Sequence, residues 1–284
     1  MDGVPPIIPL ITPPHGKGGM MGQAQGILED AMGERDACGA CRNGDAFAGA
    51  ITMAFQPIVD AVGQTVFAHE ALVRGADGAS AADVLASVDA NNQYAFDQKC
   101  RVRALECAVE AALPAMVSIN FLPNAVYNPE HCLRTTLAAA QRLDWPLPRI
   151  IFEVTEHEAI IDHRHLLSIL QTYRAHGFLT AIDDFGAGYA GLNLLADFQP
   201  DLLKLDIGLI RSIDTDKVRQ RIVRHVSQLC DDLGVRVIGE GVETAEESSV
   251  LLDLGIVLQQ GFLFARPAIG KATVPTFPDR RINV

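Results

Sequence analysis

The chain has 284 residues, of which 49% are hydrophobic and 20% are charged, and this composition predicts a globular protein with a large buried core. Its formal net charge of -12 argues against duplex nucleic acid as a partner, because such binding needs a broad surface of Lys and Arg. No segment reaches the roughly 20 apolar residues that cross a bilayer, and no signal peptide is recognisable. We therefore expect a cytoplasmic protein without a membrane partner.

Residues 1–45 are rich in Pro, Gly and Met and show no sustained period, which predicts a flexible leader before a folded domain over residues 46–284. Cys38 and Cys41 have the CxxC spacing of some zinc and redox sites. A second such pair and a nearby pair of histidines are both missing from the sequence. We interpret these cysteines as ordinary reduced thiols.

From Ile51 onward, eight apolar segments of strand length alternate with stretches of helical pattern, which is typical of βα units in a parallel sheet. The predicted strands are 51–59, 65–73, 116–122, 150–155, 179–184, 201–207, 235–240 and 257–264. The predicted helices are 96–112, 130–143, 162–176, 216–234 and 244–253, the last opening with a capping box. Residues 268–284 show no convincing helix. This order predicts an α/β fold, a (β/α)₈ TIM-like barrel.

The link between the first two strands, Asp60 to Gln64, is too short for a helical crossover. Parallel neighbours need a connection of a dozen or more residues, whereas antiparallel ones need only a turn. The barrel is therefore expected to begin with an antiparallel first strand.

Polar residues recur at or near the ends of seven of these apolar strands. They are Glu70, Asn120, Glu153, Asp183 with Asp184, Lys204, Glu240 and Gln260. A charge in a buried strand is costly unless it is paired or ligated, so a repeated set indicates a shared purpose. Since the carboxyl ends of barrel strands converge on one face, these side chains are expected to meet there.

The set contains carboxylates and amides but no His or Cys, a donor chemistry that suits Mg²⁺ or Mn²⁺ better than zinc. The adjacent Asp183 and Asp184 would allow one carboxylate to bridge two ions. Two ions roughly 3.5 to 4 Å apart are a common device for phosphodiester hydrolysis. Lys204 and Glu240 would then supply a cation that positions water and a candidate general base.

Several motifs resemble those of the EAL family of cyclic di-GMP phosphodiesterases, in the family's order. They are Gln56-Pro57-Ile58-Val59, Glu70-Ala71-Leu72-Val73-Arg74, Phe152-Glu153-Val154-Thr155-Glu156, Asp183-Asp184-Phe185-Gly186-Ala187-Gly188-Tyr189, Lys204-Leu205-Asp206, Glu240-Gly241-Val242-Glu243 and Gln260-Gly261. The resemblance runs from about Ala48 to Pro267. It implies the same irregular barrel, hydrolysis of cyclic di-GMP to the linear dinucleotide pGpG with Mg²⁺ or Mn²⁺, and a homodimer formed near the Asp184 loop.

The resemblance also assigns roles to individual residues. The first metal would be held by Glu70, Asn120, Glu153 and Asp183, and the second by Asp183 and Asp184, partly through waters. Glu240 would be the general base and Lys204 would orient the attacking water. Gln56, Arg74 and Gln260 would contact the substrate or complete the second metal's surroundings, while Glu156 and Glu243 would support the loops.

Two other functions stay open on the sequence. One is a catalytically silent receptor that binds cyclic di-GMP and signals through protein partners. The other is a structural dimer module that binds no nucleotide. Retention of every matched ligand and of the candidate base favours the phosphodiesterase.

Overall fold

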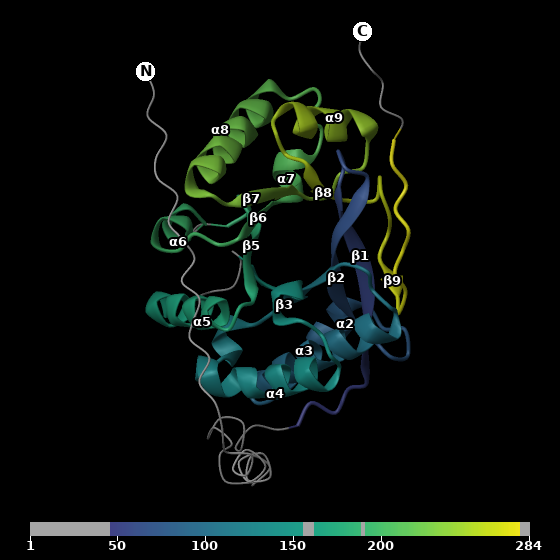
Figure 1. Cartoon of the computed structure of the whole chain (residues 1–284), viewed down its shortest axis with the longest axis vertical. Coiled ribbons are helices and arrows are strands. Elements are labelled where there is room, and N and C mark those ends of the chain that lie inside the picture. Colours follow the sequence, from purple (N-terminus) through teal and green to yellow (C-terminus); the bar gives the residue numbers. More distant parts are fainter. Residues whose placement is uncertain (1–45, 156–161, 189–190, 279–284) are drawn as a thin grey trace, which may run out of the picture. The chain divides into compact units, whose positions relative to one another are not determined.

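The computed structural model describes residues 46–155, 162–188 and 191–278, so the predicted leader with Cys38 and Cys41 lies outside the described residues. Eight strands close into a barrel in the order β2-β3-β4-β5-β6-β7-β8-β1, with β1 pairing back onto β2 (Figure 1). Their bounds are β1 (Ile51–Asp60), β2 (Thr65–Gly75), β3 (Met116–Asn120), β4 (Ile150–Thr155), β5 (Leu179–Phe185), β6 (Leu202–Leu205), β7 (Arg236–Gly239) and β8 (Leu258–Gln260). The predicted (β/α)₈ barrel is confirmed.

The first strand is antiparallel to both of its barrel neighbours, as the short link between the first two strands predicted. β1 pairs antiparallel with both β2 and β8, and the strands from β2 to β8 pair parallel. The turn between β1 and β2 is closed by Asp60, whose Oδ1 accepts the amides of Val62 and Gly63 at 2.9 and 2.8 Å. Such side-chain to backbone bonds are a common way to form a tight turn. A short strand absent from the prediction, β9 (Ala268–Ile269), pairs with β1.

The long helices lie around the strands and match the predicted ones to within a few residues (Figure 1). They are α3 (Gln93–Glu110), α4 (Pro129–Arg142), α5 (His163–Ala175), α8 (Lys217–Leu233) and α9 (Ala245–Asp253). Four of them begin at a side chain that accepts a backbone amide: Asn128, Asp162, Asp216 and Thr244. These caps satisfy amides that the first helical turn leaves without partners. The predicted capping box of Thr244 and Glu247 is confirmed.

Three short helices were not predicted: α2 (Ala81–Leu85), α6 (Gly191–Asp197) and α7 (Ile207–Ile210). Each spans at most two turns, which is too short for a helical period to stand out in the sequence. Single-turn 3₁₀ segments occur at η2 (Pro123–Ala125) and η3 (Leu147–Arg149). Among the described residues that follow β8, up to residue 278, none is helical, and the rest of the segment for which no convincing helix was predicted lies outside the described residues.

The core has two parts, because strand side chains alternate between the outside and the inside of the barrel. The larger part lies between the strands and the helices and includes Phe55, Phe152, Leu203 and Val223. The smaller part fills the barrel interior. It consists of Ile58, Ala68, Ile151, Ala181, Leu202, Ile238 and Leu258. This inner apolar layer closes one end of the barrel and positions the polar layer described below.

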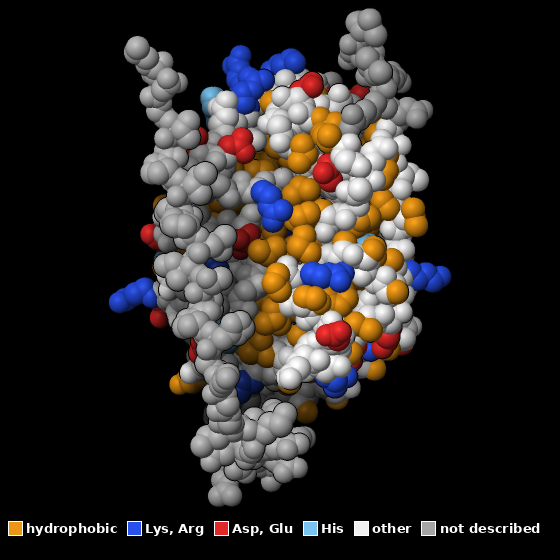
Figure 2. Space-filling view, in the orientation of Figure 1, with side chains coloured by type: hydrophobic (Ala, Val, Ile, Leu, Met, Phe, Trp, Pro, Cys, Tyr) orange, Lys and Arg blue, Asp and Glu red, His pale blue; other side chains and the backbone are white. Residues whose placement is uncertain are grey.

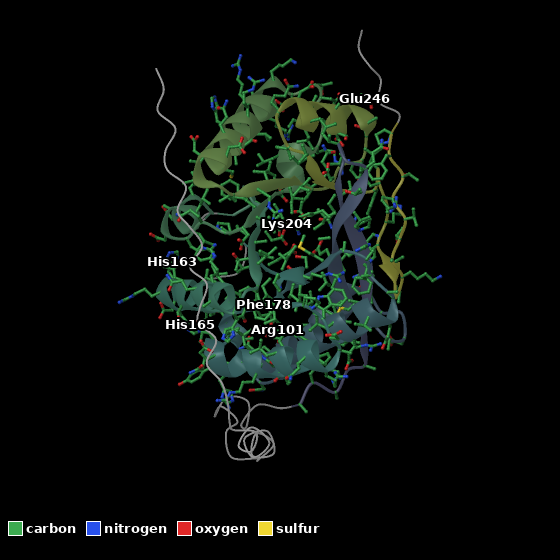
Figure 3. The ribbon with its side chains drawn as sticks, viewed as in Figure 1. Arg101, His163, His165, Phe178, Lys204 and Glu246 are labelled. Carbon is green, nitrogen blue, oxygen red and sulfur yellow. The ribbon has the colours of Figure 1, made fainter. Side chains whose placement is uncertain are left out.

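A buried ion pair within helix α3 packs against the wall of the barrel. Arg101 is fully buried and its guanidinium lies 2.7 Å from Asp97 and 2.6 Å from the Tyr173 hydroxyl. Phe121, Phe152 and Tyr173 surround it with ring centroids at 5.2 to 5.5 Å, an arrangement favourable for a cation. Figure 3 shows Arg101 beside Phe178 on the helix-covered side of the strands. Asp97 also accepts the amide of Leu122 at 3.0 Å, which fixes the chain just after Asn120.

His69 on β2 is a source of acid sensitivity. It is 1% exposed, and within the described residues neither ring nitrogen has a hydrogen-bond partner. Burial lowers the pKa of His69 to about 4. Because the unfolded chain protonates this group near pH 6.5, stability is intact above that pH and falls as the pH drops toward 4.

Replacing His69 by Leu is therefore expected to make the free energy of unfolding less dependent on pH below about pH 6.5. Between pH 7 and 5 the wild type should lose roughly 1 to 2 kcal/mol more than His69→Leu. Urea denaturation at both pH values measures the difference, with the exposed His225→Leu as the matched control. Identical pH slopes for wild type and His69→Leu would contradict the assignment.

On the face seen in Figure 2, Lys and Arg side chains are scattered among hydrophobic and acidic ones and form no broad positive area. The described residues contain no helix that is both long enough and apolar enough to pass through a bilayer.

Candidate active site

The polar strand-end residues form a layer directly above the apolar interior of the barrel. Glu70, Glu153, Asp183, Lys204, Glu240 and Gln260 each follow an interior apolar residue by two positions, as Glu70 follows Ala68 and Lys204 follows Leu202. Gln56 joins them from the antiparallel strand, opposite Glu70. Since the strand period is two, a side chain two positions beyond an interior residue also points inward. The predicted convergence of the strand-end residues has this geometric origin.

Lys204 lies at the centre of the layer (Figure 3). Its side chain is 1% exposed. Its Nζ lies 2.8 Å from Glu240, 2.9 Å from Asp183 and 3.1 Å from Glu153. A fourth carboxylate, Glu70, lies at 3.6 Å. One ammonium therefore faces four carboxylates from four different strands or strand ends.

Neutral side chains hold these carboxylates in place. The Asn120 and Gln260 amides donate to the two oxygens of Glu70 at 3.0 and 2.8 Å. The Ser118 hydroxyl donates to Glu153 at 2.5 Å. Ser118 was not among the predicted site residues, although its position two residues before Asn120 on β3 already placed it on the interior face.

The site carries more negative charge than its lysine can neutralise. Burial, with a smaller contribution from the neighbouring Glu70 and Asp183, raises the pKa of Glu153 to about 8 against the opposing effect of Lys204. Burial likewise raises the pKa of Glu240 well above its usual range. Burial alone would lower the pKa of Lys204, but the four carboxylates outweigh it and hold that pKa well above normal. An added cation would relieve the excess negative charge.

The oxygen atoms are arranged in two groups that fit divalent cations. Ligand oxygens of Glu70, Glu153 and Asp183 lie within 4.8 Å of one another, and so do those of Asp183, Asp184 and Glu240. Asp183 belongs to both groups, as a bridging carboxylate would. The Oε1 of Gln260 is buried and lacks a hydrogen-bond partner within the described part of the chain. An all-oxygen set of this kind suits Mg²⁺ or Mn²⁺.

Asp184 is held in an unusual backbone conformation at the mouth of the site. Its φ is +54°, in the left-handed region that non-glycine residues seldom occupy, and Gly186 follows with φ of +100°. The Asp184 amide donates to Asp183 Oδ1 at 3.0 Å. This turn brings two consecutive carboxylates to the site, whereas regular strand alternation would send one of them outward.

A pocket of about 210 Å³ opens above the layer. Six of the predicted site residues line it: Gln56, Glu70, Asp184, Glu240, Glu243 and Gln260. The other lining residues were not predicted as site residues, and they are Asp206, Ile207, Gly241, Gly261 and Phe262. These contacts come from loops after β6, β7 and β8, whose conformation has no regular pattern in the sequence.

Arg74, Gln56 and Glu243 each have a protein partner in the structure, and Arg74 is not among the residues that line the pocket. Arg74 is half-buried near the end of β2 and its guanidinium donates to the carbonyl of Val73 at 2.7 Å. Gln56 donates to the carbonyl of Ala265 at 3.2 Å. Glu243 pairs with Arg211 at 2.5 Å, and this guanidinium lowers the Glu243 pKa. Glu156 lies outside the described residues, so its loop-supporting role stays a prediction.

Glu247 forms the predicted capping box with Thr244 and also binds two further backbone amides. It is 2% exposed and accepts the amides of Ser212 and Glu243, each at 2.9 Å. It thereby joins the segment after α7 to the loop after Glu240. In addition, a Cβ on Gly241 would lie 2.4 Å from the Ile207 side chain, so α7 packs directly on that loop. Helix α7 therefore helps to fix the backbone next to Glu240.

The family model described as EAL domain matches residues 44–267. Among curated proteins, the chain is 32% identical over 229 residues to "Blue light- and temperature-regulated antirepressor BluF" of Escherichia coli, covering 80% of this chain and 57% of that protein. It is 39% identical over 127 residues to "Cyclic di-GMP phosphodiesterase PdeR" of the same organism, covering 45% of this chain and 19% of that protein. The chain therefore spans 57% of the length of BluF and 19% of the length of PdeR.

Solved structures agree in fold. A standalone EAL protein from Vibrio cholerae O395 in a c-di-GMP-bound form is 47% identical, with a TM-score of 0.79 over 81% of this chain and 98% of that one. Klebsiella pneumoniae BlrP1, in a manganese and cyclic di-GMP complex, is 36% identical, with a TM-score of 0.74 over 80% of this chain and 58% of that one.

Proposed function

The chain belongs to the EAL domain family, and on that premise we propose that it hydrolyses cyclic di-GMP to the linear dinucleotide pGpG with two divalent cations. The observation that carries the proposal is the enclosure of Lys204 by four carboxylates, with Asp183 shared between two groups of acidic oxygens. Neutralising this excess negative charge and binding an anionic phosphodiester are both tasks that divalent cations perform. The site is thus suited to phosphodiester chemistry.

Glu70, Asn120, Glu153 and Asp183 would hold the first cation, and Asp183 with Asp184 the second. The cations, when bound, would polarise the phosphoryl oxygens and lower the pKa of the attacking water. Charge of the opposite sign near Glu240 would also counter the burial that raises its pKa, leaving this carboxylate ionised and able to accept a proton.

The residues of the chain would then act as follows. Glu240 accepts a proton from water while Lys204, 2.8 Å from it, orients that water toward phosphorus. The water oxygen bonds to phosphorus and the bond from phosphorus to the ribose 3′ oxygen breaks. The leaving oxygen takes a proton from solvent, Glu240 returns its proton to solvent, and the product is a linear dinucleotide with one terminal phosphate. Gln56, Arg74 and Gln260 would contact the substrate and hold it in position for this attack.

A homodimer near the Asp184 loop is part of this proposal. Leu192 on α6 and Ile207 on α7, both in the segments that follow the Asp184 loop, are 63% and 43% exposed and would offer apolar surface to such an interface. Light scattering of the purified chain tests this assembly.

Turnover is expected to require Mg²⁺ or Mn²⁺. Incubation with cyclic di-GMP, followed by chromatography, should give pGpG with either ion and no product with EDTA. Calcium should activate poorly, since its larger and looser coordination misplaces the attacking water. Equal turnover in EDTA and in Mn²⁺ would contradict the metal-dependent reaction.

A receptor that binds cyclic di-GMP without cleaving it is the second candidate. It is favoured by the similarity to BluF, a protein described as an antirepressor. Calorimetric binding of intact cyclic di-GMP, with no product at any metal concentration, would select this alternative. Glu240 and Lys204 are both present and lie 2.8 Å apart, which favours the hydrolase.

A further inference from the structure

A second buried cation, Arg101 on α3, lies behind the barrel wall and has no role in the reaction proposed above. Its side chain is 0% exposed, it pairs with Asp97 at 2.7 Å, and it donates to the Tyr173 hydroxyl at 2.6 Å. A buried ion pair is costly to desolvate, and apolar side chains of similar volume often replace one without loss of stability. Stability alone therefore does not account for a charged pair at this position.

The aromatic rings around Arg101 belong to residues next to two proposed ligands of the first cation. Phe121 directly follows Asn120, and its ring centroid lies 5.5 Å from the guanidinium carbon. Phe152 directly precedes Glu153, and its ring centroid lies at 5.2 Å. Because side chains alternate across a strand, a ring that packs outward leaves the adjacent ligand pointing into the barrel. Arg101 thus contacts, from the helix-covered side, the two strand ends that carry these ligands.

A backbone hydrogen bond connects this cluster to the chain beside Asn120. Regular pairing of β3 ends at Asn120, and Phe121 still donates its amide to the Glu153 carbonyl at 3.1 Å. The next amide, that of Leu122, donates instead to Asp97 Oδ1 at 3.0 Å. Asp97 therefore supplies the acceptor that the sheet no longer provides, and it fixes the backbone two positions from the ligand.

We propose that Asp97 is a positioning residue for the first divalent cation, with Arg101 as its buried counter-ion, an inference that rests on the proposed function. The Asn120 Nδ2 donates to Glu70 at 3.0 Å, so Oδ1 is the atom of this amide that would ligate a cation. The bond between Leu122 and Asp97 would hold that oxygen in place. Partners outside the ligand set that orient the ligands typically contribute about 10- to 100-fold to metal affinity.

The test is calorimetric titration of Mn²⁺ into the metal-free chain without nucleotide. An Asp184→Asn background weakens the second group of acidic oxygens and leaves the first as the tighter site. Two double variants, Asp97→Asn/Arg101→Met and Asp97→Leu/Arg101→Met, both remove the buried ion pair. Asn and Leu have similar size and shape, but only Asn keeps an oxygen that can accept the Leu122 amide.

The variant with Leu should raise the Kd for Mn²⁺ by about 10- to 100-fold, whereas the variant with Asn should stay within about threefold of the parent. The control is Val223→Ala in the same background, which creates a cavity in the core under α8 and should leave the Kd unchanged. A purely structural role for Asp97 predicts that affinity does not distinguish the two double variants. Equal Kd values for that pair would overturn the proposal.

Tyr173→Phe decides the question if the double variants do not fold. It keeps the ring against Phe121 and Phe152 but removes the hydroxyl that binds Arg101. The looser hold on Arg101, and through it on Asp97, should raise the Kd for Mn²⁺ by about 2- to 10-fold, the effect of one lost hydrogen bond. A Kd equal to that of the parent would count against the proposal in the same way.

The titrations also separate this inference from the proposed reaction. If the chain with its natural residues binds Mn²⁺ but leaves cyclic di-GMP intact, and the Asp97 variants still differ as expected, the reaction fails and the positioning role stands. Hydrolysis of cyclic di-GMP with equal Mn²⁺ affinities in the Asp97 variants would remove the positioning role alone. A chain that binds no Mn²⁺ would remove both.

Discussion

Replacing Glu240 by Gln is expected to lower the turnover of cyclic di-GMP by about 10²- to 10⁴-fold, the usual contribution of a positioned general base. The amide keeps the size of the side chain and can still accept a hydrogen bond from Lys204, now 2.8 Å from Glu240 Oε1. It cannot accept a proton from water. Binding of the nucleotide should therefore persist while hydrolysis is lost.

The measurement is the steady-state rate of pGpG formation with saturating Mn²⁺, together with calorimetric affinity for the nucleotide. Glu246→Gln is the matched control, because Glu246 is exposed on α9, away from Lys204 in Figure 3. It should retain wild-type turnover. Equal turnover in Glu240→Gln and wild type would exclude Glu240 as the base.

Replacing Lys204 by Met is expected to abolish turnover and to destabilise the metal-free protein by about 3 to 5 kcal/mol, the usual effect of removing one partner from a buried ion pair. Removal of one partner from a buried ion pair leaves uncompensated charge, and here four carboxylates lose their shared cation. Met keeps a similar length, so the loss of packing is small. Denaturation by urea in EDTA measures the change.

The pH dependence gives this prediction a second readout. Lys204 lowers the pKa of Glu153 and Glu240 against the effect of burial, so its removal raises these pKa values further. The folded variant then binds more protons than the folded wild type, and it should gain stability relative to wild type as the pH falls from 8 to 6. The exposed Lys217→Met is the control and should match wild type at both pH values. A Lys204→Met variant as stable as wild type at pH 8 would show that the carboxylates do not depend on this cation.

The barrel could be predicted from the sequence because its strands follow simple rules. Short apolar segments that alternate with helical stretches predicted the strands, and the five-residue link from Asp60 to Gln64 predicted the antiparallel start. Glu70, Glu153 and Lys204 were predicted to converge because each stands at the end of an apolar run, and in the structure they lie two positions beyond the interior residues Ala68, Ile151 and Leu202. Patterns within single strands were therefore sufficient to predict the metal-ligand layer.

Features that depend on contacts between distant segments could not be predicted in this way. The Ser118 hydroxyl reaches Glu153 across 35 positions, and Asp97 reaches the Leu122 amide from a helix. Phe262 resembles any aromatic residue near a strand end until its exposure and its contact with Arg266 are known. The left-handed turn at Asp184 likewise has no signature in a pair of adjacent aspartates.

The most direct test of the proposed reaction is hydrolysis of cyclic di-GMP by the purified chain in ¹⁸O-labelled water with Mn²⁺, followed by mass spectrometry of the product. Attack of water on phosphorus predicts pGpG with one ¹⁸O atom in its terminal phosphate, and no product when EDTA is present. Recovery of intact cyclic di-GMP under conditions in which calorimetry shows it bound would contradict a hydrolase and identify the chain as a receptor.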